Sequence, residues 1–245
     1  VNKTIFTIIK NNDQLRVFML FAMLSNAGFY TTTGVLDYFF EAVIGDTGAQ
    51  STFSLFGTVG SVLGMLVIPV MMKFTTRRRT YQFSLSLSLF GYIGMFLAGQ
   101  FMGNLMMLNI FYVLTQIGTA SMFISQTVFL ADVVDYGEVK MGVRRESVTF
   151  SMKGFLQKMA YTIQTIILFV SLGVSKYDGS LHNANPESAK LAITVMLTVI
   201  PPVLFVISLI IFSTKFKLHG EFMESITAQV TANALEREKA ANGEE

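Results

Sequence analysis

The stretch that decides the fold is TYQFSLSLSLFGYIGMFLAGQFMGNLMMLNIFYVLTQIGTASMFISQTVFLA (residues 80–131), which contains no Asp, Glu, Lys or Arg. An α-helix needs about 20 predominantly apolar residues to cross a bilayer core of ~30 Å, so this stretch is long enough for two crossings. Gly, Gln and Asn gather near its middle, at residues 99–104 (GQFMGN), where we expect a turn. The stretch therefore predicts two membrane-spanning helices, over about 80–99 and 105–131.

The composition of the whole chain agrees with a membrane protein. Of its 245 residues, 52% are hydrophobic and only 14% are charged, and the mean hydropathy is +0.54. A soluble domain usually carries roughly 25% charged residues, because its surface must be hydrated. The sequence contains no cysteine, which excludes disulfides and thiolate chemistry, and its two histidines argue against a histidine zinc site or a catalytic triad. We expect an integral membrane protein that is not an enzyme.

The same length criterion predicts four further spans. The expected fold is an all-α bundle of six transmembrane helices, over about 16–40, 48–72, 80–99, 105–131, 148–175 and 190–213. Pro201 and Pro202 lie within the last span, where their missing backbone donors predict a kink. Residues 1–15 precede this bundle of residues 16–214, and residues 215–245 follow it as a polar tail.

Two interpretations of the tail stay open. Leu218, Phe222 and Ile226 recur at a spacing of four residues, which favours a short amphipathic helix on the membrane surface. The polar composition of the rest of the tail equally suits a solvated, partly disordered segment.

The distribution of basic residues predicts the orientation. Lys and Arg in short loops mark the cytoplasmic face of a membrane protein. Six spans place both termini on one side, which then receives Lys3, Lys10, Arg16, Lys73, Arg77, Arg78, Arg79, Lys140, Arg144, Arg145, Lys215 and Lys217. Lys176 and Lys190 belong to the opposite side. We expect a cell (inner) membrane location with both termini cytoplasmic, and no nucleic-acid partner, because the basic run lacks a broader basic surface with accessible aromatics.

The fifth span carries charges at membrane depth. Lys158 lies about ten residues into it, which is ~15 Å and close to the midplane. A charge at this depth is costly and usually functional, and a central lysine reaches neither interface easily. No acidic residue of the chain is expected at that level, so we expect the partner of Lys158 to come from elsewhere. Lys153, ~8 Å deep, can still reach the interface, and Gln157 adds to the polar character of a helix that we expect to line a cavity or a helix interface.

The fourth span has a similar polar character. Gln126 and several Ser and Thr residues stand near Phe123. Sugars need this combination, because their C–H faces pack on aromatic rings while their hydroxyls require donors and acceptors. From the residues alone, ordinary packing explains Phe123 better than ligand contact, since the chain has 23 Phe.

The end of the fourth span reads ADVVDYGEVKMGVRRES (residues 131–147). Asp132, Asp135 and Glu138 lie along one face if the helix continues. Three carboxylates can hold a divalent cation, but Arg144 and the basic run containing Arg77 belong to the same side of the membrane. We therefore favour an ionic network, acting as a gate that forms in one conformation and breaks in another, over a metal site.

These motifs resemble those of the glycoside–pentoside–hexuronide cation symporters, a branch of the major facilitator superfamily. The segment ADVVDYGEVKMGVRRES followed by VTFSMKGFLQKM is similar to the end of that family's tenth helix, a basic stretch and a lysine within its eleventh helix. NNDQL (11–15), the pair Tyr38 and Phe39, and GDTG (45–48) resemble the seventh helix and following loop of lactose- and melibiose-type members. The resemblance runs over nearly the whole chain.

The resemblance implies a larger protein than this sequence. The family has twelve helices in two halves, and this chain is similar to the C-terminal half, with residues 1–15 as the cytoplasmic part of the middle loop. The implied activity is cation-coupled sugar symport by alternating access, with a galactoside-type glycoside as the expected sugar. The implied partners are the sugar, H⁺ or Na⁺, the lipid bilayer and an N-terminal six-helix half. Residues of that half are expected to supply most of the binding site for the co-transported cation, and no other cofactor is implied.

The resemblance also assigns residues. It places Lys158, Lys153, Gly154, Gln157 and Phe123 at cavity-facing positions, beside Gln126 of the fourth span. Asp132, Asp135, Glu138, Arg144 and Arg77 become the cytoplasmic gate.

The melibiose-permease pattern has Trp at the Phe123 position and Gln at the Lys153 position, whereas lactose-type members tend to carry a basic residue at the latter. A function from another class stays open, namely a six-helix scaffold or sensor that binds a partner without transport.

Overall fold

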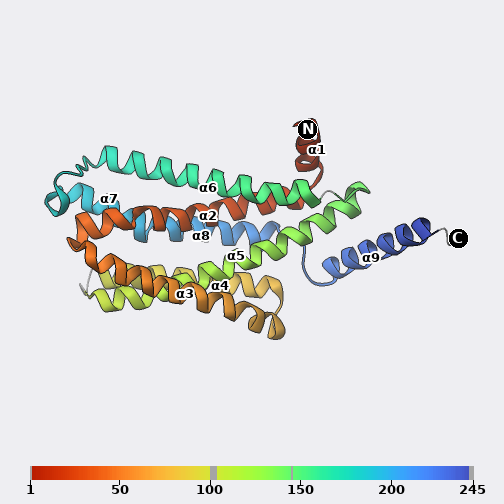
Figure 1. The fold of residues 1–245 in the computed structure, drawn as a ribbon, viewed down its shortest axis with the longest axis horizontal. Helices are drawn as coiled ribbons and strands as arrows, with labels where there is room; N and C mark the ends of the chain where they lie inside the picture. Colours follow the sequence, from red (N-terminus) through yellow and green to blue (C-terminus); the bar gives the residue numbers. More distant parts are fainter. Residues whose placement is uncertain (1, 100–103, 145, 243–245) are drawn as a thin grey trace.

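The computed structural model describes residues 2–99, 104–144 and 146–242 (Figure 1). Its elements are α1 (Asn2–Asn11), α2 (Asp13–Tyr38), the π-helical η1 (Phe39–Ile44), α3 (Thr47–Phe74), α4 (Arg77–Leu97), α5 (Leu105–Met141), α6 (Glu146–Val174), the short η3 (His182–Ala184), α7 (Glu187–Thr198), α8 (Ile200–Lys215) and α9 (Gly220–Asn242). The predicted all-α fold is confirmed for these residues.

Small polar side chains fix where several helices begin. The Asn12 carboxamide oxygen accepts a hydrogen bond from the Leu15 N–H at 2.8 Å, and Asp46, Thr76 and Asn104 cap α3, α4 and α5 in the same way. Each cap satisfies N–H groups that have no partner within the first helical turn. Helix α2 therefore begins at Asp13, three residues before the expected start of the first span.

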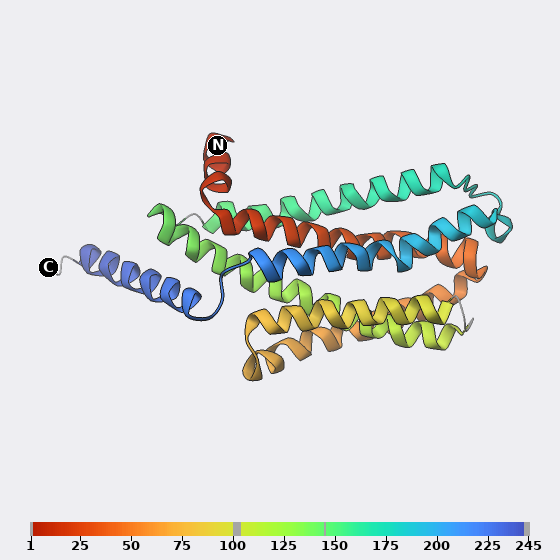
Figure 2. The same cartoon turned by 180° about the vertical axis from the view of Figure 1, so that it is seen from behind.

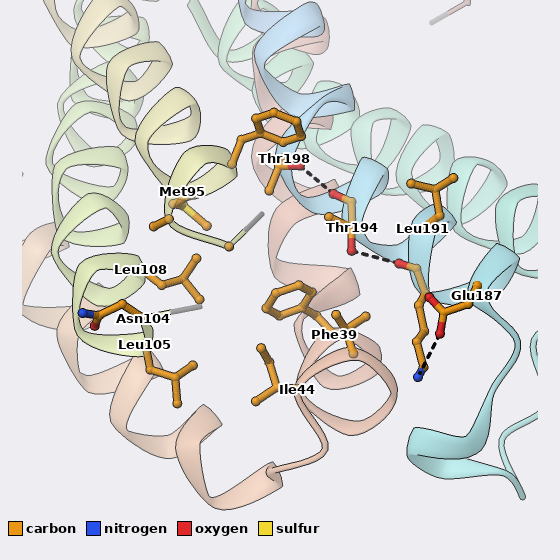
Figure 3. A pocket seen from close by; sticks show the side chains of 15 residues that line it. Phe39, Ile44, Met95, Asn104, Leu105, Leu108, Glu187, Leu191, Thr194 and Thr198 are labelled. Atoms are coloured by element: carbon orange, nitrogen blue, oxygen red, sulfur yellow. Dashed lines mark hydrogen bonds and ion pairs between the residues drawn. The ribbon is translucent and has the colours of Figure 1, made fainter. Parts of the chain in front are cut away.

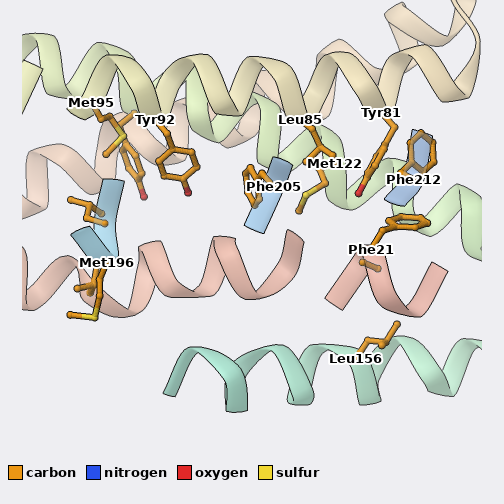
Figure 4. Packing of buried hydrophobic residues seen from close by; sticks show 14 of the residues in the cluster. Phe21, Tyr81, Leu85, Tyr92, Met95, Met122, Leu156, Met196, Phe205 and Phe212 are labelled. Atoms are coloured by element: carbon orange, nitrogen blue, oxygen red, sulfur yellow. The ribbon is translucent and has the colours of Figure 1, made fainter. Parts of the chain in front are cut away.

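The helices form two groups that pack along their length. Helices α2, α6, α7 and α8 form one group, and α3, α4 and α5 form the other, with α5 crossing towards α2 (Figures 1 and 2). A buried aromatic cluster joins the two groups. The Phe21 ring of α2 lies 5.5 Å from Tyr81 of α4 and 5.2 Å from Phe212 of α8, both edge to face (Figure 4). Such pairs add about 0.5–1.5 kcal/mol each beyond the burial of their area.

Helices α3 and α5 approach closely at glycines. A Cβ atom on Gly64 would lie 2.4 Å from the Ile117 carbonyl oxygen, and one on Gly60 would lie 2.7 Å from the Val113 carbonyl oxygen. Small residues four apart let helix backbones meet in this way inside membranes.

Four helical segments of the described chain are long and apolar enough to cross a membrane: Thr47–Phe74, Leu105–Met141, Thr149–Val174 and Glu187–Lys215. Helices α2 and α4, which cover the other two predicted spans, are more polar. Their buried faces include Ser25, Asn26 and Thr32 on α2 and Ser84 and Ser88 on α4.

The largest boundary differences from the sequence prediction are in the last span and in α5. The last predicted span consists of two helices, because α7 ends at Thr198 and α8 begins at Ile200, just before the proline pair that was expected to cause a kink. Helix α5 continues ten residues past its expected end at 131, to Met141. The predicted turn at 99–104 lies mainly in residues 100–103, outside the described part of the chain.

The two ends of the bundle differ in charge. Helices α1 and α9, the α3–α4 connection and the α5–α6 connection lie together at one end (Figure 1). We call this the basic end, because it carries Arg77, Arg78, Arg79, Lys140 and Arg144. The short helices η1 and η3 and the start of α7 lie at the opposite end.

Candidate functional site

Helix α6 runs along the outer edge of the bundle and carries an unpaired charge (Figure 1). The Lys158 side chain is exposed, and no described residue forms a hydrogen bond or ion pair with its ammonium group. Thr162 and Thr165, further along α6, are also exposed, and each hydroxyl donates to a carbonyl of its own helix. A potential membrane-spanning helix therefore presents a polar stripe away from its neighbours.

Lys153 faces inward from the same helix. Its Nζ donates a hydrogen bond to the Thr127 hydroxyl of α5, 2.8 Å away. This contact fixes the lysine between α5 and α6, whereas the sequence left it free to reach the interface. Gly154, the next residue, has open space where a Cβ atom would stand.

Four aromatic rings gather beside these polar groups. Tyr30 of α2 stacks on Tyr161 of α6, with ring centroids 3.8 Å apart and planes inclined by 19°. Phe123 of α5 packs edge to face on Phe29, with centroids 5.0 Å apart, and lies 6.4 Å from Tyr30. Gln157 lies within hydrogen-bonding reach of the Tyr30 hydroxyl. Helices α2, α5 and α6 thus place aromatic rings within about one helical turn of amide, hydroxyl and ammonium groups.

Gln126 lies apart from this cluster. Its side chain is buried and donates from Nε2 to the Ser25 hydroxyl of α2, 2.9 Å away. In this conformation Gln126 joins α5 to α2 within the core, beside the aromatic cluster of Phe21 and Tyr81. Of the six residues assigned to the binding face by the sequence, the structure brings Lys153, Gln157 and Phe123 together between α2, α5 and α6, whereas Gly154 and Lys158 lie on the exposed side of α6.

The carboxylates at the end of α5 form ion pairs with two different arginines. Arg77, at the start of α4, donates to Asp132 at 2.6 Å. The Asp132 side chain is only 5% exposed, and its other oxygen is buried without a hydrogen-bond partner among the described residues. This pair joins the α3–α4 connection to α5.

Arg144 occupies the space among the other carboxylates. Its guanidinium contacts Glu138 at 3.0 Å, Asp135 at 2.9 Å and Glu146 at 3.2 Å. The hydrogen bond with Glu138, supported by those with Asp135 and Glu146, raises the pKa of Arg144 above its usual range, so its charge is permanent. The predicted ionic network is therefore present, as two separate groups centred on Arg77 and Arg144.

Helix α9 adds a further arginine to this network. Arg237 contacts Glu138 at 2.9 Å, and the Glu138 side chain is 1% exposed. Ile226 is buried, while the Phe222 ring lies 6.2 Å from Tyr136 of α5. The tail thus forms a helix that contacts α5, so its helical conformation agrees with the first of the two interpretations, while the expected placement on the membrane surface stays a prediction. The sequence alone did not single out Arg237, because nothing in its local pattern points to α5.

A cavity of about 580 Å³ lies at the end of the bundle away from the ionic network (Figure 3). Its walls come from η1, α4, α5 and α7 and are mainly apolar, including Phe39, Met95 and Leu108. Glu187 and Lys190 form an ion pair at 3.4 Å among the lining residues. The cavity is lined by none of the sequence-predicted site residues; its polar lining residues are Asn104, Glu187, Lys190, Thr194 and Thr198.

The sequence did not single out Tyr30 and Tyr161. Tyr30 lies in an uncharged stretch and Tyr161 follows Lys158 by three residues, but the significance of the two rings arises only where α2 meets α6. Lys158 stood out because it is a charge among apolar residues, and an uncharged aromatic gives no such signal.

A helical bundle with apolar membrane-length segments and polar side chains clustered at membrane depth is the arrangement of a membrane transport protein. Residues 3–220 match the model of the MFS/sugar transport protein family, and the chain belongs to this family.

Relatives extend over nearly all of the chain. The lactose permease of Leuconostoc lactis is 25% identical, over 99% of this chain and 37% of the permease. The putative glycoside/cation symporter YagG of Escherichia coli (strain K12) is 24% identical, over 97% of this chain and 50% of the symporter. The raffinose carrier protein of Pediococcus pentosaceus is 22% identical, over 92% of this chain and 35% of the carrier. The chain spans half or less of the length of these relatives, which are transporters and not enzymes.

Proposed function

We propose that the chain is the C-terminal six-helix half of a cation-coupled sugar symporter that works by alternating access, with a galactoside-type glycoside as substrate. The observation that carries this proposal is the unpaired Lys158 on a helix of membrane-spanning length. A charge so placed needs a partner or water, and an N-terminal half docked on α6 would supply either. In this proposal α2 and α4 are the two remaining spans, and both termini are cytoplasmic.

The side chains around Lys158 suit a sugar. The stacked Tyr30 and Tyr161 offer an aromatic surface, and Gln157 and Lys153 offer amide and ammonium donors beside it. Pyranosides combine apolar C–H faces with hydroxyls, so both kinds of group are required at one site. Names of relatives that include lactose, raffinose and glycoside support the substrate class.

The co-transported H⁺ or Na⁺ would bind mainly to carboxylates of the N-terminal half. Lys158 would pair with those carboxylates when the cation is absent and release them when it binds, because a cation and a lysine compete for the same negative charge. This competition couples the two substrates without a resident cofactor.

The ion pairs at the basic end would act as the cytoplasmic gate. Arg77 with Asp132, and Arg144 with Asp135 and Glu138, tie together helices that must separate when the cytoplasmic side opens. Their formation would favour the outward-facing state.

The alternative is a non-transporting scaffold or sensor whose polar α6 face binds a partner protein. The exposed stripe of Lys158, Thr162 and Thr165 suits a partner helix as well as a cavity, so only activity separates the two functions.

Counterflow of labelled sugars in de-energised vesicles tests the proposal. The full-length protein would be compared with the 245-residue chain, using galactosides, glucosides, xylosides and glucuronides, each with and without Na⁺. Galactoside exchange by the full-length protein, but not by the 245-residue chain, would support the proposal that this chain is one half of a transporter. Absence of exchange for every sugar, from protein shown to be folded and inserted, would favour the scaffold.

A further inference from the structure

Asn26 carries a buried polar group that the fold leaves unsatisfied. Its side chain lies in the middle of α2 and is 4% exposed, and its Oδ1 has no hydrogen-bond partner among the described residues. Other buried polar side chains of α2 are paired: Ser25 with the Phe21 carbonyl, and Thr31 with the Ala27 carbonyl. Leaving a buried acceptor unpaired costs about 1–3 kcal/mol, so the unpaired Oδ1 of Asn26 calls for a ligand or water.

The position of Asn26 follows from helix geometry. It precedes Tyr30 by four residues, which places it on nearly the same face of α2 and about 6 Å nearer the basic end. Helices α2 and α6 run in the same direction, because Tyr30 stacks on Tyr161 and Gly34 faces Gln164. Four residues back from Tyr161 is Gln157, so Asn26 lies at the level of Gln157.

Helix α5 gives the same level independently. It runs opposite to α2, since Phe123 contacts Phe29 and Gln126 contacts Ser25. One turn beyond Phe123 is Thr127, which holds the Lys153 ammonium of α6 at 2.8 Å. Each of the three helices therefore presents an aromatic residue at one level and a polar residue one turn closer to the basic end.

We propose that Asn26 determines sugar specificity, by accepting a hydrogen bond from one pyranoside hydroxyl while the ring packs against the Tyr30–Tyr161 pair. This inference rests on the proposed transport function and adds α2 to the binding face, which the sequence drew from two other helices. The ligand is a neutral glycoside. The carboxylate of an acidic sugar would be attracted to Lys153 or Lys158. An ionised carboxylate has no proton to donate, so it could not form a hydrogen bond with Asn26 Oδ1, which is also an acceptor.

Binding to the purified full-length protein tests this role. Asn26→Leu keeps the approximate volume and removes the amide, and Thr31→Val is the matched control, because the Thr31 hydroxyl is satisfied within its own helix. A glycoside identified by counterflow, and its set of monodeoxy analogues, would be titrated against each variant. We expect Asn26→Leu to weaken the parent glycoside about tenfold. For one monodeoxy analogue, we expect the affinity for the wild type to be about tenfold weaker than that of the parent glycoside. On Asn26→Leu, the same analogue and the parent glycoside should bind with equal affinity.

Thermal unfolding of the ligand-free variants separates binding from structure. Asn26→Leu should melt at the same temperature as the wild type or higher, since the substitution removes an unpaired polar group. A lowered melting temperature with unchanged glycoside affinity would overturn the inference and assign Asn26 to packing. The inference would also be overturned if every monodeoxy analogue bound the wild type with the same affinity as the parent glycoside. The proposed function would still stand in that case, because it rests on sugar exchange by the wild type. Failure of the folded wild type to bind any glycoside would instead overturn the proposed function.

Discussion

Arg77 and Asp132 form an ion pair in which one partner is exposed and the other is buried. Their atoms are 2.6 Å apart, and the side chains are 55% and 5% exposed. Removing the arginine leaves the buried carboxylate without compensation, whereas removing both charges leaves no such penalty.

We therefore expect Arg77→Ala to lower the free energy of unfolding by about 1–3 kcal/mol, the cost of an unpaired buried group. Asp132→Asn added to it should restore most of the loss. Arg79→Ala is the matched control, because the Arg79 side chain is exposed like that of Arg77 but forms no ion pair with a described residue. Thermal unfolding of the detergent-purified full-length protein measures all three. Equal melting temperatures for Arg77→Ala and Arg79→Ala would contradict the structural role of the pair.

Lys158 is expected to be necessary for coupling but not for folding, because no described residue depends on its ammonium group. In the full-length protein, Lys158→Ala should abolish sugar accumulation while membrane insertion and melting temperature stay close to the wild type. Lys158→Arg keeps the charge and should retain part of the activity. Normal accumulation by Lys158→Ala would refute the role.

Gly154 is a suitable position for a cysteine-labelling test of the proposed binding face. This chain contains no cysteine, and a side chain added at Gly154 meets open space. Gly154→Cys, in a full-length background without other cysteines, should react with a thiol reagent, and a bound sugar should slow the reaction. Gly173→Cys on the same helix is equally open but far from the Tyr30–Tyr161 pair, so its labelling rate should not respond to sugar. Equal protection at both positions would place the sugar elsewhere.

Gly64 is expected to tolerate no side chain. A Cβ atom there would lie 2.4 Å from the Ile117 carbonyl of α5, and backbone cannot move aside as a flexible side chain can. Gly64→Ala should lower the free energy of unfolding by about 1–3 kcal/mol. Gly173→Ala should cause no loss, since open space surrounds Gly173, and comparing the two by thermal unfolding isolates the close approach from the change in helix propensity.

The parts of the fold that depend on the lipid bilayer were predictable from the sequence. Long uncharged stretches give helices in a bilayer, and a proline pair marked the helix break near Val199. Gly60 and Gly64 are a pair of small residues four apart, and they pack closely against α5. The extension of α5 to Met141 was not expected, because its last residues are polar and are held by contacts with Arg77, Arg144 and α9 rather than by lipid.

The candidate site was predictable only in part. Charged residues such as Lys158 and Arg144 stand out in an apolar sequence, whereas Asn26, Tyr30 and Tyr161 do not. Their proximity depends on the relative rotation of α2, α5 and α6, which hydrophobic patterning leaves undetermined when helices are apolar on most faces. For the same reason the sequence assigned Gln126 to the binding face, although its partner Ser25 lies on the core side of α2.

His219 should make stability depend on pH at the basic end. Burial and the neighbouring positive charge of Arg78 lower the pKa of His219 from its ordinary value of 6.5. The unfolded chain therefore takes up the proton at a higher pH than the folded protein does, so stability is full above pH 6.5 and declines as pH falls through that value. His219→Gln should remove this part of the decline, whereas the same change at His182, at the opposite end of the bundle, should leave it in place. Melting temperatures of the full-length protein between pH 8 and pH 5, at constant ionic strength, measure the effect. A steeper decline in His219→Gln than in the wild type would mean that the proton stabilises the Arg78 contact, which is the reverse of the direction expected from two like charges.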